Sequence, residues 1–472
     1  MTAPPVQIDA RVPGADGPAG TSGSAVAPML TLEQLHALPA AQQPDYADPA
    51  AVASAVSQLR KLPPLVFAGE CDTLLDRLAD VANGKAFVLQ GGDCAETFEG
   101  VRADAIRNTL RTLLSMSIVL TYAGGVPVVK MGRIAGQYAK PRSKGSEIRD
   151  GVELPAYRGD AVNGFEFTAA DRRHDPDRLL RVYNASAATL NLVRAFTYGG
   201  EADLRQVHAW NRGFVRDNPA GERYEQLAAD IEKAIAFMHA CGVSDEAFHT
   251  VSLYSSHEAL LLDYEHAMTR IDSRTGLPYD TSGHFLWVGE RTRQLDAAHM
   301  RLAATIHNPV GVKLGPTTTV DEALGYARVL NPANTPGRLT FITRMGAGKI
   351  REKLPPLLQG VTNAGVVAAW ICDPMHGNTF ETETGYKTRR FEDVIDEVRG
   401  FFDVHRELGT WPGGLHVELS GEEVTECVGG GYQLAEGDLS QRYETLCDPR
   451  LNRGQSLELA FLVAEMLARV SA

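Results

Sequence analysis

Short apolar runs alternate with longer amphipathic segments along most of the chain. The runs are rich in Val, Leu, Ile and Phe, a composition typical of buried β-strands. Segments with the periodicity of a helix, such as 102–124 and 320–330, separate most of them. The strand candidates occupy eight stretches, at 85–92, 126–133, 248–258, 286–291, 310–315, 338–346, 366–377 and 414–421. Strands joined by helical crossovers run parallel, so eight such units predict an α/β fold, a (β/α)8 TIM barrel.

Three regions fall outside this alternation. Residues 1–28 are rich in Pro, Gly, Ala and Ser and are expected to form a flexible tail. Residues 29–84 carry helical patterns and are expected to form an N-terminal helical extension. Residues 85–472 would then be the catalytic barrel. Extra helices are expected at about 175–240, because the second and third strand candidates are too far apart for one crossover.

Composition excludes several kinds of partner. The formal net charge is -13, which argues against nucleic acid and against acidic membrane surfaces. The six cysteines lack the spacing of a disulfide framework or a CxxC zinc site. No apolar run approaches the roughly 18 residues of a membrane span. We therefore expect a cytoplasmic protein whose anionic substrates, if any, require a local basic pocket.

The end of nearly every strand candidate carries a residue suited to chemistry. Cys94 sits just past the first apolar run, in "LQGGDCAETFEG", where a strand would give way to a loop. Because active sites of such barrels lie at the carboxyl ends of the strands, these residues should meet at one mouth. The later strand ends contribute Arg133, Ser255, Ser256, Glu258, Glu290, Arg291, Lys313, Arg344, His376 and Glu418.

One group of these residues has the chemistry of metal ligands. Cys94, His376 and Glu418 offer a thiolate, an imidazole and a carboxylate, and Asp448 in "ETLCDPRLN" would add a second carboxylate. Such a mixed set suits Mn, Fe, Co or Zn better than Ca or Mg.

A second group is cationic. Arg133, Arg291, Lys313 and Arg344 would place four positive charges at the mouth of an acidic protein. The loop "YAKPRSKGSE" at 138–147 adds Lys140, Arg142 and Ser143. These residues indicate two bound anions, or one substrate with both a phosphate and a carboxylate. A metal beside anion clamps suits polarisation of a carbonyl, but the residues alone leave aldol chemistry, phosphate-ester cleavage and condensation open.

The motifs closely resemble those of type II 3-deoxy-D-arabino-heptulosonate 7-phosphate (DAHP) synthases, which catalyse the first step of the shikimate pathway to chorismate and the aromatic amino acids. The similarity spans residues 85–452. The matching motifs are "LQGGDCAE", "KMGRIAGQYAKPRS", "WVGERTRQLD", "HNPVGVKLGPTT", "RLTFITRMGA", "CDPMHGNT", "GGLHVELSGEEVTEC" and "ETLCDPRLN".

This resemblance implies a transferase that condenses phosphoenolpyruvate with D-erythrose 4-phosphate and water, giving DAHP and phosphate. It implies a divalent metal, Mn²⁺ before Co²⁺, Zn²⁺ or Fe²⁺, held by Cys94, His376, Glu418 and Asp448. Phosphoenolpyruvate would be bound by Arg133, Glu290, Arg291, Lys313 and Arg344. Erythrose 4-phosphate would be bound by Lys140, Pro141, Arg142, Ser143 and Arg291. The expected catalytic residues are Arg133, Glu290, Lys313 and His376, with Glu290 orienting the water.

The resemblance also implies regulation and assembly. It suggests a homo-oligomer, a dimer or tetramer, with allosteric feedback by aromatic amino acids and a small chorismate mutase as partner. The N-terminal helices and the inserted helices would provide interface and effector sites. Two alternatives are a class II type aldolase, which uses several His ligands, and a catalytically idle protein that kept the fold.

Cys447 immediately precedes the proposed ligand Asp448. If Cys94 and Asp448 share one metal, Cys447 lies beside the site. Two outcomes remain open: Cys447 is a buried spectator, or it forms a disulfide with Cys94 when the metal is absent.

Overall fold

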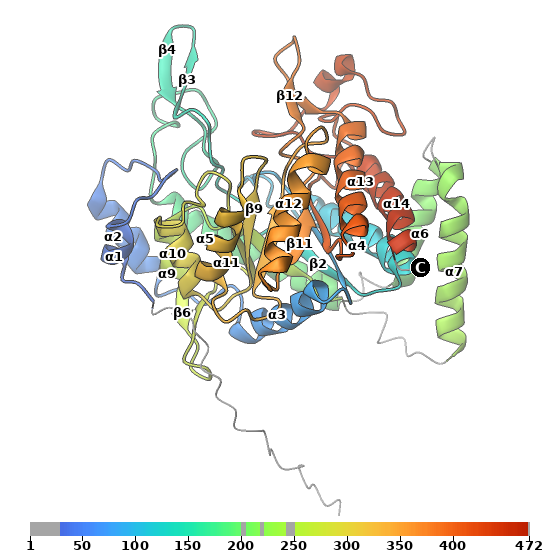
Figure 1. The fold of residues 1–472 in the computed structure, drawn as a ribbon. Coiled ribbons are helices and arrows are strands. Elements are labelled where there is room, and N and C mark those ends of the chain that lie inside the picture. Colours follow the sequence, from blue (N-terminus) through green and yellow to red (C-terminus); the bar gives the residue numbers. More distant parts are fainter. Residues whose placement is uncertain (1–28, 200–203, 218–220, 242–250, 471–472) are drawn as a thin grey trace, which may run out of the picture.

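The computed structural model describes residues 29–199, 204–217, 221–241 and 251–470 (Figure 1). At its centre is a closed barrel of parallel strands in the order β1-β14-β11-β10-β9-β8-β5-β2. Each strand candidate of the sequence supplies one strand, so the predicted (β/α)8 barrel is confirmed. The expected tail at 1–28 lies outside the described residues. The barrel strands are β1 (Phe87–Gly92), β2 (Val128–Arg133), β5 (Tyr254–Glu258), β8 (Phe285–Val288), β9 (Val310–Leu314), β10 (Leu339–Thr343), β11 (Ala369–Cys372) and β14 (Gly414–Glu418).

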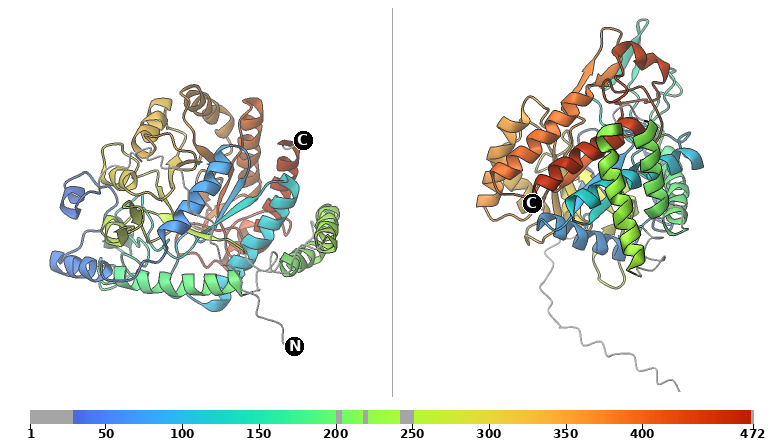
Figure 2. Two further views of the ribbon diagram at one scale, coloured as in Figure 1. Left: turned by 90° about the horizontal axis from the view of Figure 1, so that it is seen from below. Right: turned by 90° about the vertical axis from the view of Figure 1, so that its right-hand side faces the viewer.

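Both faces of the barrel strands are buried, which explains why the sequence shows apolar runs rather than strict alternation. Every residue of β1 is buried. Its Val88 points into the barrel with Trp287, whereas Phe87 packs outward in the cluster beneath the helices. Leu74 and Leu78 of α3 (Ala68–Ala82) join the interior cluster. Seen from below, α3 lies across the amino end of the barrel (Figure 2).

Helices surround the barrel in the order of the strands. Those that follow barrel strands are α4 (Ala103–Gly124), α9 (Leu262–Met268), α10 (Ala298–Thr305), α11 (Val320–Leu330), α12 (Ile350–Asn363), α13 (Phe391–Glu407) and α14 (Arg453–Val470). After α9 ends at Met268, the chain does not continue as a helix. Residues Thr269–Ile271 form β6 instead, because they pair with β7 (Pro278–Asp280).

Two groups of helices are additional to the barrel. The first comprises α1 (Leu32–His36), α2 (Pro49–Leu59) and α3. The second occupies the expected insertion with α5 (Arg178–Tyr198), α6 (Leu204–Asp217), a 3-10 turn η1 (Gly221–Tyr224) and α7 (Glu225–Ala240). Phe214 and Tyr224 stack on Phe461 of α14, which fixes this group to the outside of the barrel.

Two hairpins rise at the carboxyl end of the barrel (Figure 1). One is β3 (Ser146–Arg149) with β4 (Val152–Pro155), and the other is β12 (Thr379–Glu381) with β13 (Lys387–Arg389). A second 3-10 turn, η2 (Glu436–Gln441), lies between β14 and α14. Within the described residues, no helix combines the length and the apolar character needed to cross a bilayer.

Candidate active site at the carboxyl end of the barrel

Four potential metal ligands meet above three adjacent strands. Cys94 follows β1, His376 follows β11, and Glu418 ends β14. The donor atoms of Cys94, Glu418 and Asp448 all lie within 4.8 Å of one another. His376 Nε2 lies 3.1 Å from Glu418 Oε1. The structure therefore brings together the four residues that the sequence nominated as ligands.

The Lys140 ammonium lies among these donors. Its Nζ is 3.0 Å from Cys94 Sγ, 3.0 Å from Glu418 Oε1 and 2.9 Å from Asp448 Oδ2. Burial disfavours its charge, but Asp448, Cys94 and Glu418 together hold the pKa of Lys140 well above its ordinary value. The cluster thus already stabilises a positive charge, as a metal site must.

The His376 ring is oriented by a residue that sequence reasoning missed. Its Nδ1 lies 2.8 Å from Asp373 Oδ2, and Asp373 Oδ1 accepts the backbone N–H groups of Met375 and His376. With Nδ1 donating to Asp373, the lone pair of Nε2 is left for a cation. Asp373 directly follows β11, so its place at a strand end was the signal that could have found it.

Arg389 is the second missed residue. Its fully buried guanidinium lies 2.9 Å from Glu418 Oε2 and also contacts the Pro449 carbonyl. Burial opposes ionisation of Glu418, yet His376, Lys140 and Arg389 keep the pKa of this carboxyl well below its usual range. Arg389 comes from the β12–β13 hairpin, and nothing in the sequence pattern places it at the site.

These donors fit a divalent transition metal. They comprise one thiol, one imidazole whose Nε2 faces Glu418, and two carboxylates. Both carboxylates are held in the charged form, because the cations around Glu418 and Asp448 outweigh the effect of burial on their pKa. Burial raises the pKa of Cys94 in spite of the nearby Lys140, so a bound metal ion would be needed to turn this thiol into a thiolate ligand.

Arg133 braces this cluster from below. Its Nη2 donates to Glu418 Oε1 at 3.0 Å, and its Nη1 donates to His416 Nε2 at 2.5 Å. His416 Nδ1 in turn lies 2.7 Å from Gln90 Oε1. The Arg133 side chain is 2% exposed. The family resemblance implies that Arg133 binds phosphoenolpyruvate. Here its guanidinium contacts His416 and Glu418 of β14 and the backbone carbonyls of the loop that follows β1.

Most of the remaining predicted residues border one open cavity of about 510 Å³ beside the donor cluster, whereas Ser255 and Ser256 are buried within the barrel. Both hairpins contribute to its wall through Glu147 and Lys387. The predicted site residues that line it are Lys140, Pro141, Arg142, Ser143, Glu290, Arg291, Lys313, Arg344, His376 and Asp448. His376 and Asp448 thus belong both to the donor cluster and to the cavity, so a metal held there would face the cavity.

The cations of the cavity are anchored by neighbours. Arg291 Nη2 donates to Ser143 Oγ at 2.9 Å, and Arg344 Nη2 donates to the His376 carbonyl at 2.8 Å. Lys313 forms an ion pair with Asp373. Burial lowers the pKa of Lys313 to about 8, although Asp373 opposes that shift. Lys313 and His376 are therefore linked through one carboxylate.

Glu290 is also fixed in place. Its Oε1 lies 2.8 Å from Arg293 Nη2, and the Arg293 Nη1 contacts the Tyr326 hydroxyl. Arg293 was part of the motif "WVGERTRQLD", but its role as a partner of Glu290 followed only from the structure.

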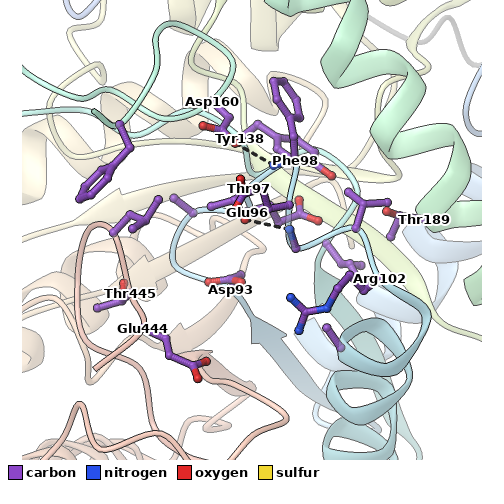
Figure 3. Close-up of a pocket in the computed structure, with 18 of the residues that line it drawn as sticks. Asp93, Glu96, Thr97, Phe98, Arg102, Tyr138, Asp160, Thr189, Glu444 and Thr445 are labelled. Carbon is purple, nitrogen blue, oxygen red and sulfur yellow. Dashed lines mark hydrogen bonds between the residues drawn. The ribbon is translucent and has the colours of Figure 1, made fainter. Parts of the chain in front are cut away.

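A second cavity, of about 570 Å³, lies beside the loop after β1 (Figure 3). In Figure 3 it lies between Thr189 of α5, Arg102 at the start of α4 and the loop of Glu444 and Thr445. Glu96 in its wall accepts the backbone N–H groups of Ala135, Gly136 and Gln137 at 2.8–2.9 Å. This carboxylate joins the loop that carries Cys94 to the loop that leads to Lys140. Of the predicted site residues, Arg133 alone borders this cavity.

Comparisons with known proteins find curated relatives that match most of this chain. The chain is 66% identical over 429 residues to a phospho-2-dehydro-3-deoxyheptonate aldolase of Streptomyces coelicolor, covering 91% of this chain and 95% of the relative. It is 55% identical over 441 residues to the corresponding aldolase of Mycolicibacterium smegmatis, covering 92% and 94%. A solved aldolase of this name from Francisella tularensis SCHU S4 covers 89% of this chain and 97% of its own, with 12% identity and a TM-score of 0.44.

The family match extends over nearly the whole described chain. Residues 30–464 match the model of the Class-II DAHP synthetase family. This range includes the barrel, both hairpins and every predicted site residue. The chain therefore belongs to the class-II DAHP synthetase family.

Proposed function

We propose that this protein condenses phosphoenolpyruvate with D-erythrose 4-phosphate and water, releasing DAHP and inorganic phosphate. Family membership and the two relatives named as aldolases of this product support the proposal. The observation that carries it is structural: a buried cluster of metal-type donors and a cation-lined cavity share one barrel mouth, with His376 and Asp448 common to both.

Cys94, His376, Glu418 and Asp448 would hold a divalent metal, Mn²⁺ before Co²⁺, Zn²⁺ or Fe²⁺. When bound, such an ion supplies Lewis acidity toward the aldehyde oxygen of erythrose 4-phosphate. Asp373 keeps His376 in the tautomer that presents Nε2. Arg389 and Arg133 keep Glu418 charged.

The cations of the cavity would bind the two anionic substrates. Lys313, Arg344 and Arg291, with Glu290 beside them, would hold phosphoenolpyruvate, and Arg133 would add its charge from below. Lys140, Pro141, Arg142, Ser143 and Arg291 would hold the sugar phosphate. The hydrogen bond from Arg291 to Ser143 joins a residue of the proposed phosphoenolpyruvate subsite to one of the proposed sugar-phosphate subsite, which supports placing the two subsites side by side. Binding both anions in one fixed orientation lowers the entropic part of the reaction barrier, because the two substrates no longer have to meet in the correct geometry by chance.

The chemistry follows from this placement. C3 of phosphoenolpyruvate attacks the aldehyde carbon, and positive charge develops at C2. Water adds to C2, and Glu290, fixed by Arg293, orients that water. The resulting hemiketal phosphate then expels phosphate, whose negative charge Lys313 and Arg344 stabilise.

We further propose that the protein is a homo-oligomer, a dimer or tetramer, inhibited by aromatic amino acids and able to bind a small chorismate mutase. The helices of 29–84 and the inserted helices of about 175–240 would serve these contacts, since they have no place in the chemistry. Family membership supports these proposals. Turnover measured with Phe, Tyr and Trp, singly and together, tests the effector proposal.

The test of the function is an assay of phosphate release. Release should require phosphoenolpyruvate, erythrose 4-phosphate and a divalent metal together, and DAHP should form in equal amount. A class II type aldolase would act on a sugar phosphate without releasing phosphate from phosphoenolpyruvate. A protein without catalytic activity would release none under any combination, and either result would refute the proposal.

A further inference from the structure

Glu258, the last residue of β5, lines the cavity of about 510 Å³ from the strand between Arg133 and Glu290. Its backbone N–H donates to Gln137 Oε1 at 2.9 Å, and Gln137 is itself held by Glu96. Its carboxylate packs against the bare backbone of Gly289, where a Cβ atom would lie 1.9 Å from Oε1. The side chain is therefore fixed at the cavity wall, and a methyl group at Gly289 would displace it.

Among the described residues, the Glu258 carboxylate has neither a hydrogen-bond donor nor a cation within ion-pair distance, and its Oε1 is buried. Two other carboxylates of the cavity, Glu290 and Asp448, are paired. Glu290 is held by Arg293 at 2.8 Å, and Asp448 lies 2.9 Å from Lys140. A buried, unpaired carboxylate is costly, and a negative charge here repels both phosphorylated substrates. Such a group is expected to have a role in the reaction itself.

The surroundings of Glu258 suit proton transfer. Burial raises the pKa of this carboxyl above its ordinary value, while Lys140, Lys313, His376 and Arg133 oppose that effect from the neighbouring strands and loops. A carboxyl with a raised pKa binds a proton more firmly than an exposed one, so it is a stronger base toward water near neutral pH.

We propose that Glu258 is the general base that accepts a proton from the water adding to C2 of phosphoenolpyruvate. This inference rests on the proposed function and deepens it. The water oxygen forms the new bond to C2 while one O–H bond breaks toward Glu258. That proton is balanced by the one taken up at the former aldehyde oxygen, so one water is consumed per turnover. Glu290 orients the same water and stays paired with Arg293.

The experiment compares Glu258→Gln and Glu258→Asp with the parent enzyme, loaded with Mn²⁺. Glu381→Gln is the matched control, because Glu381 is an exposed carboxylate at the rim of the same cavity. Glu258→Gln should lower kcat by about 10²–10⁴-fold, the usual contribution of a general base. KM for phosphoenolpyruvate should stay constant or fall, because a repelling charge is gone, and the Mn²⁺ affinity should not change. Glu258→Asp should recover part of kcat, and Glu381→Gln should match the parent.

The pH profile separates a base from a structural residue. Because the base must be deprotonated, turnover of the parent should rise as pH increases through the raised pKa of Glu258. Glu258→Gln should lose this limb and keep its residual rate constant over the same range. A kcat within threefold of the parent overturns the inference, as does a rise in KM equal to the fall in kcat with an unchanged pH profile. If the parent enzyme itself releases no phosphate, the result refutes the proposed function rather than the role of Glu258.

Discussion

The two sides of the barrel mouth stabilise charge in opposite ways. The donor side, on β1, β14 and β11, is buried and internally balanced: Glu418 and Cys94 are fully buried, with Lys140, Arg133 and Arg389 around them. The cavity side is open. Its Arg344 and Arg142 are half-buried, and Arg291 is exposed. On the donor side, buried cations of the protein balance the buried carboxylates. On the cavity side, the positive charges would be balanced by anionic ligands when these bind.

This difference predicts how each side responds to change. Removing one partner from a buried ion pair leaves an uncompensated charge and costs about 3–5 kcal/mol. Removing a half-exposed cation from the cavity costs the fold little, since exposed pairs contribute about 0–1 kcal/mol. Donor-side variants should thus alter stability and metal binding, while cavity-side variants should alter substrate use.

The largest effect is expected from removing the metal. Exhaustive chelation should abolish phosphate release, because no residue of the cavity can replace Lewis acidity at the aldehyde, and Mn²⁺ or Co²⁺ should restore it. Phosphoenolpyruvate binding, measured by calorimetry, should persist in the chelated protein. Undiminished turnover in protein that elemental analysis finds free of metal would contradict the donor-side assignment.

Arg133→Ala should come next, because Arg133 lies within the donor side although the family resemblance assigns it to phosphoenolpyruvate. The sequence alone would predict a loss of phosphoenolpyruvate use with metal binding spared. Its contacts with Glu418 and His416 predict that both fall, together with the thermal stability. Arg133→Lys should rescue little, because an ammonium cannot reproduce the fork of the guanidinium. If the Mn²⁺ affinity and the melting temperature of Arg133→Ala match those of the parent, Arg133 does not support the donor side.

On the cavity side, Arg344→Ala should raise KM for phosphoenolpyruvate by about 10- to 150-fold, equivalent to the roughly 1.5–3 kcal/mol of a hydrogen bond to a charged group. Arg142→Ala should instead raise KM for erythrose 4-phosphate, and by less, because Arg142 is also near Glu147 at 3.6 Å. Both variants should keep the melting temperature and the Mn²⁺ affinity of the parent. Equal effects of both variants on both substrates would argue against two subsites.

Cys447→Ser should have the smallest effect on the reduced enzyme. Cys94 and Cys447 pack in one small buried cluster, and both thiols are free. Mild oxidation of metal-free protein should therefore join them and block metal uptake reversibly, whereas the Ser variant should resist inactivation. Peptide mass spectrometry of the oxidised parent checks the bond. Identical inactivation rates without a Cys94–Cys447 peptide would leave Cys447 a spectator.

The sequence predicted the fold well because each barrel strand is buried on both faces and ends at a chemically distinct residue. Cys94, His376 and Glu418 could be grouped from sequence because parallel strands open to one end. What the sequence could not supply were contacts set by side-chain direction. Arg133 lies at a strand end as expected, but its partners Glu418 and His416 belong to β14, on the far side of β1 in the barrel.

Other contacts of the site could not be predicted from the sequence, because the residues that make them lie on segments without a periodic hydrophobic pattern. Arg389 reaches Glu418 from a three-residue strand, and Lys140 reaches the donors from a loop. The β3–β4 hairpin carries exposed Ile148 and Val152, so its pattern did not mark a buried strand. Short elements of this kind are specified by tertiary contacts rather than by local preference.

The pairing of β1 with both β2 and β14 also constrains how the protein is made. Cys94 and Asp448 touch although they are 354 residues apart in the chain. A nascent polypeptide carries the first proposed ligand, Cys94, early but cannot close the barrel until nearly all of its sequence has left the ribosome. Contacts this distant in sequence form late, so the order of synthesis delays the site. Metal uptake should therefore report completion of the barrel, and a refolding chain should acquire its ion in the last kinetic phase.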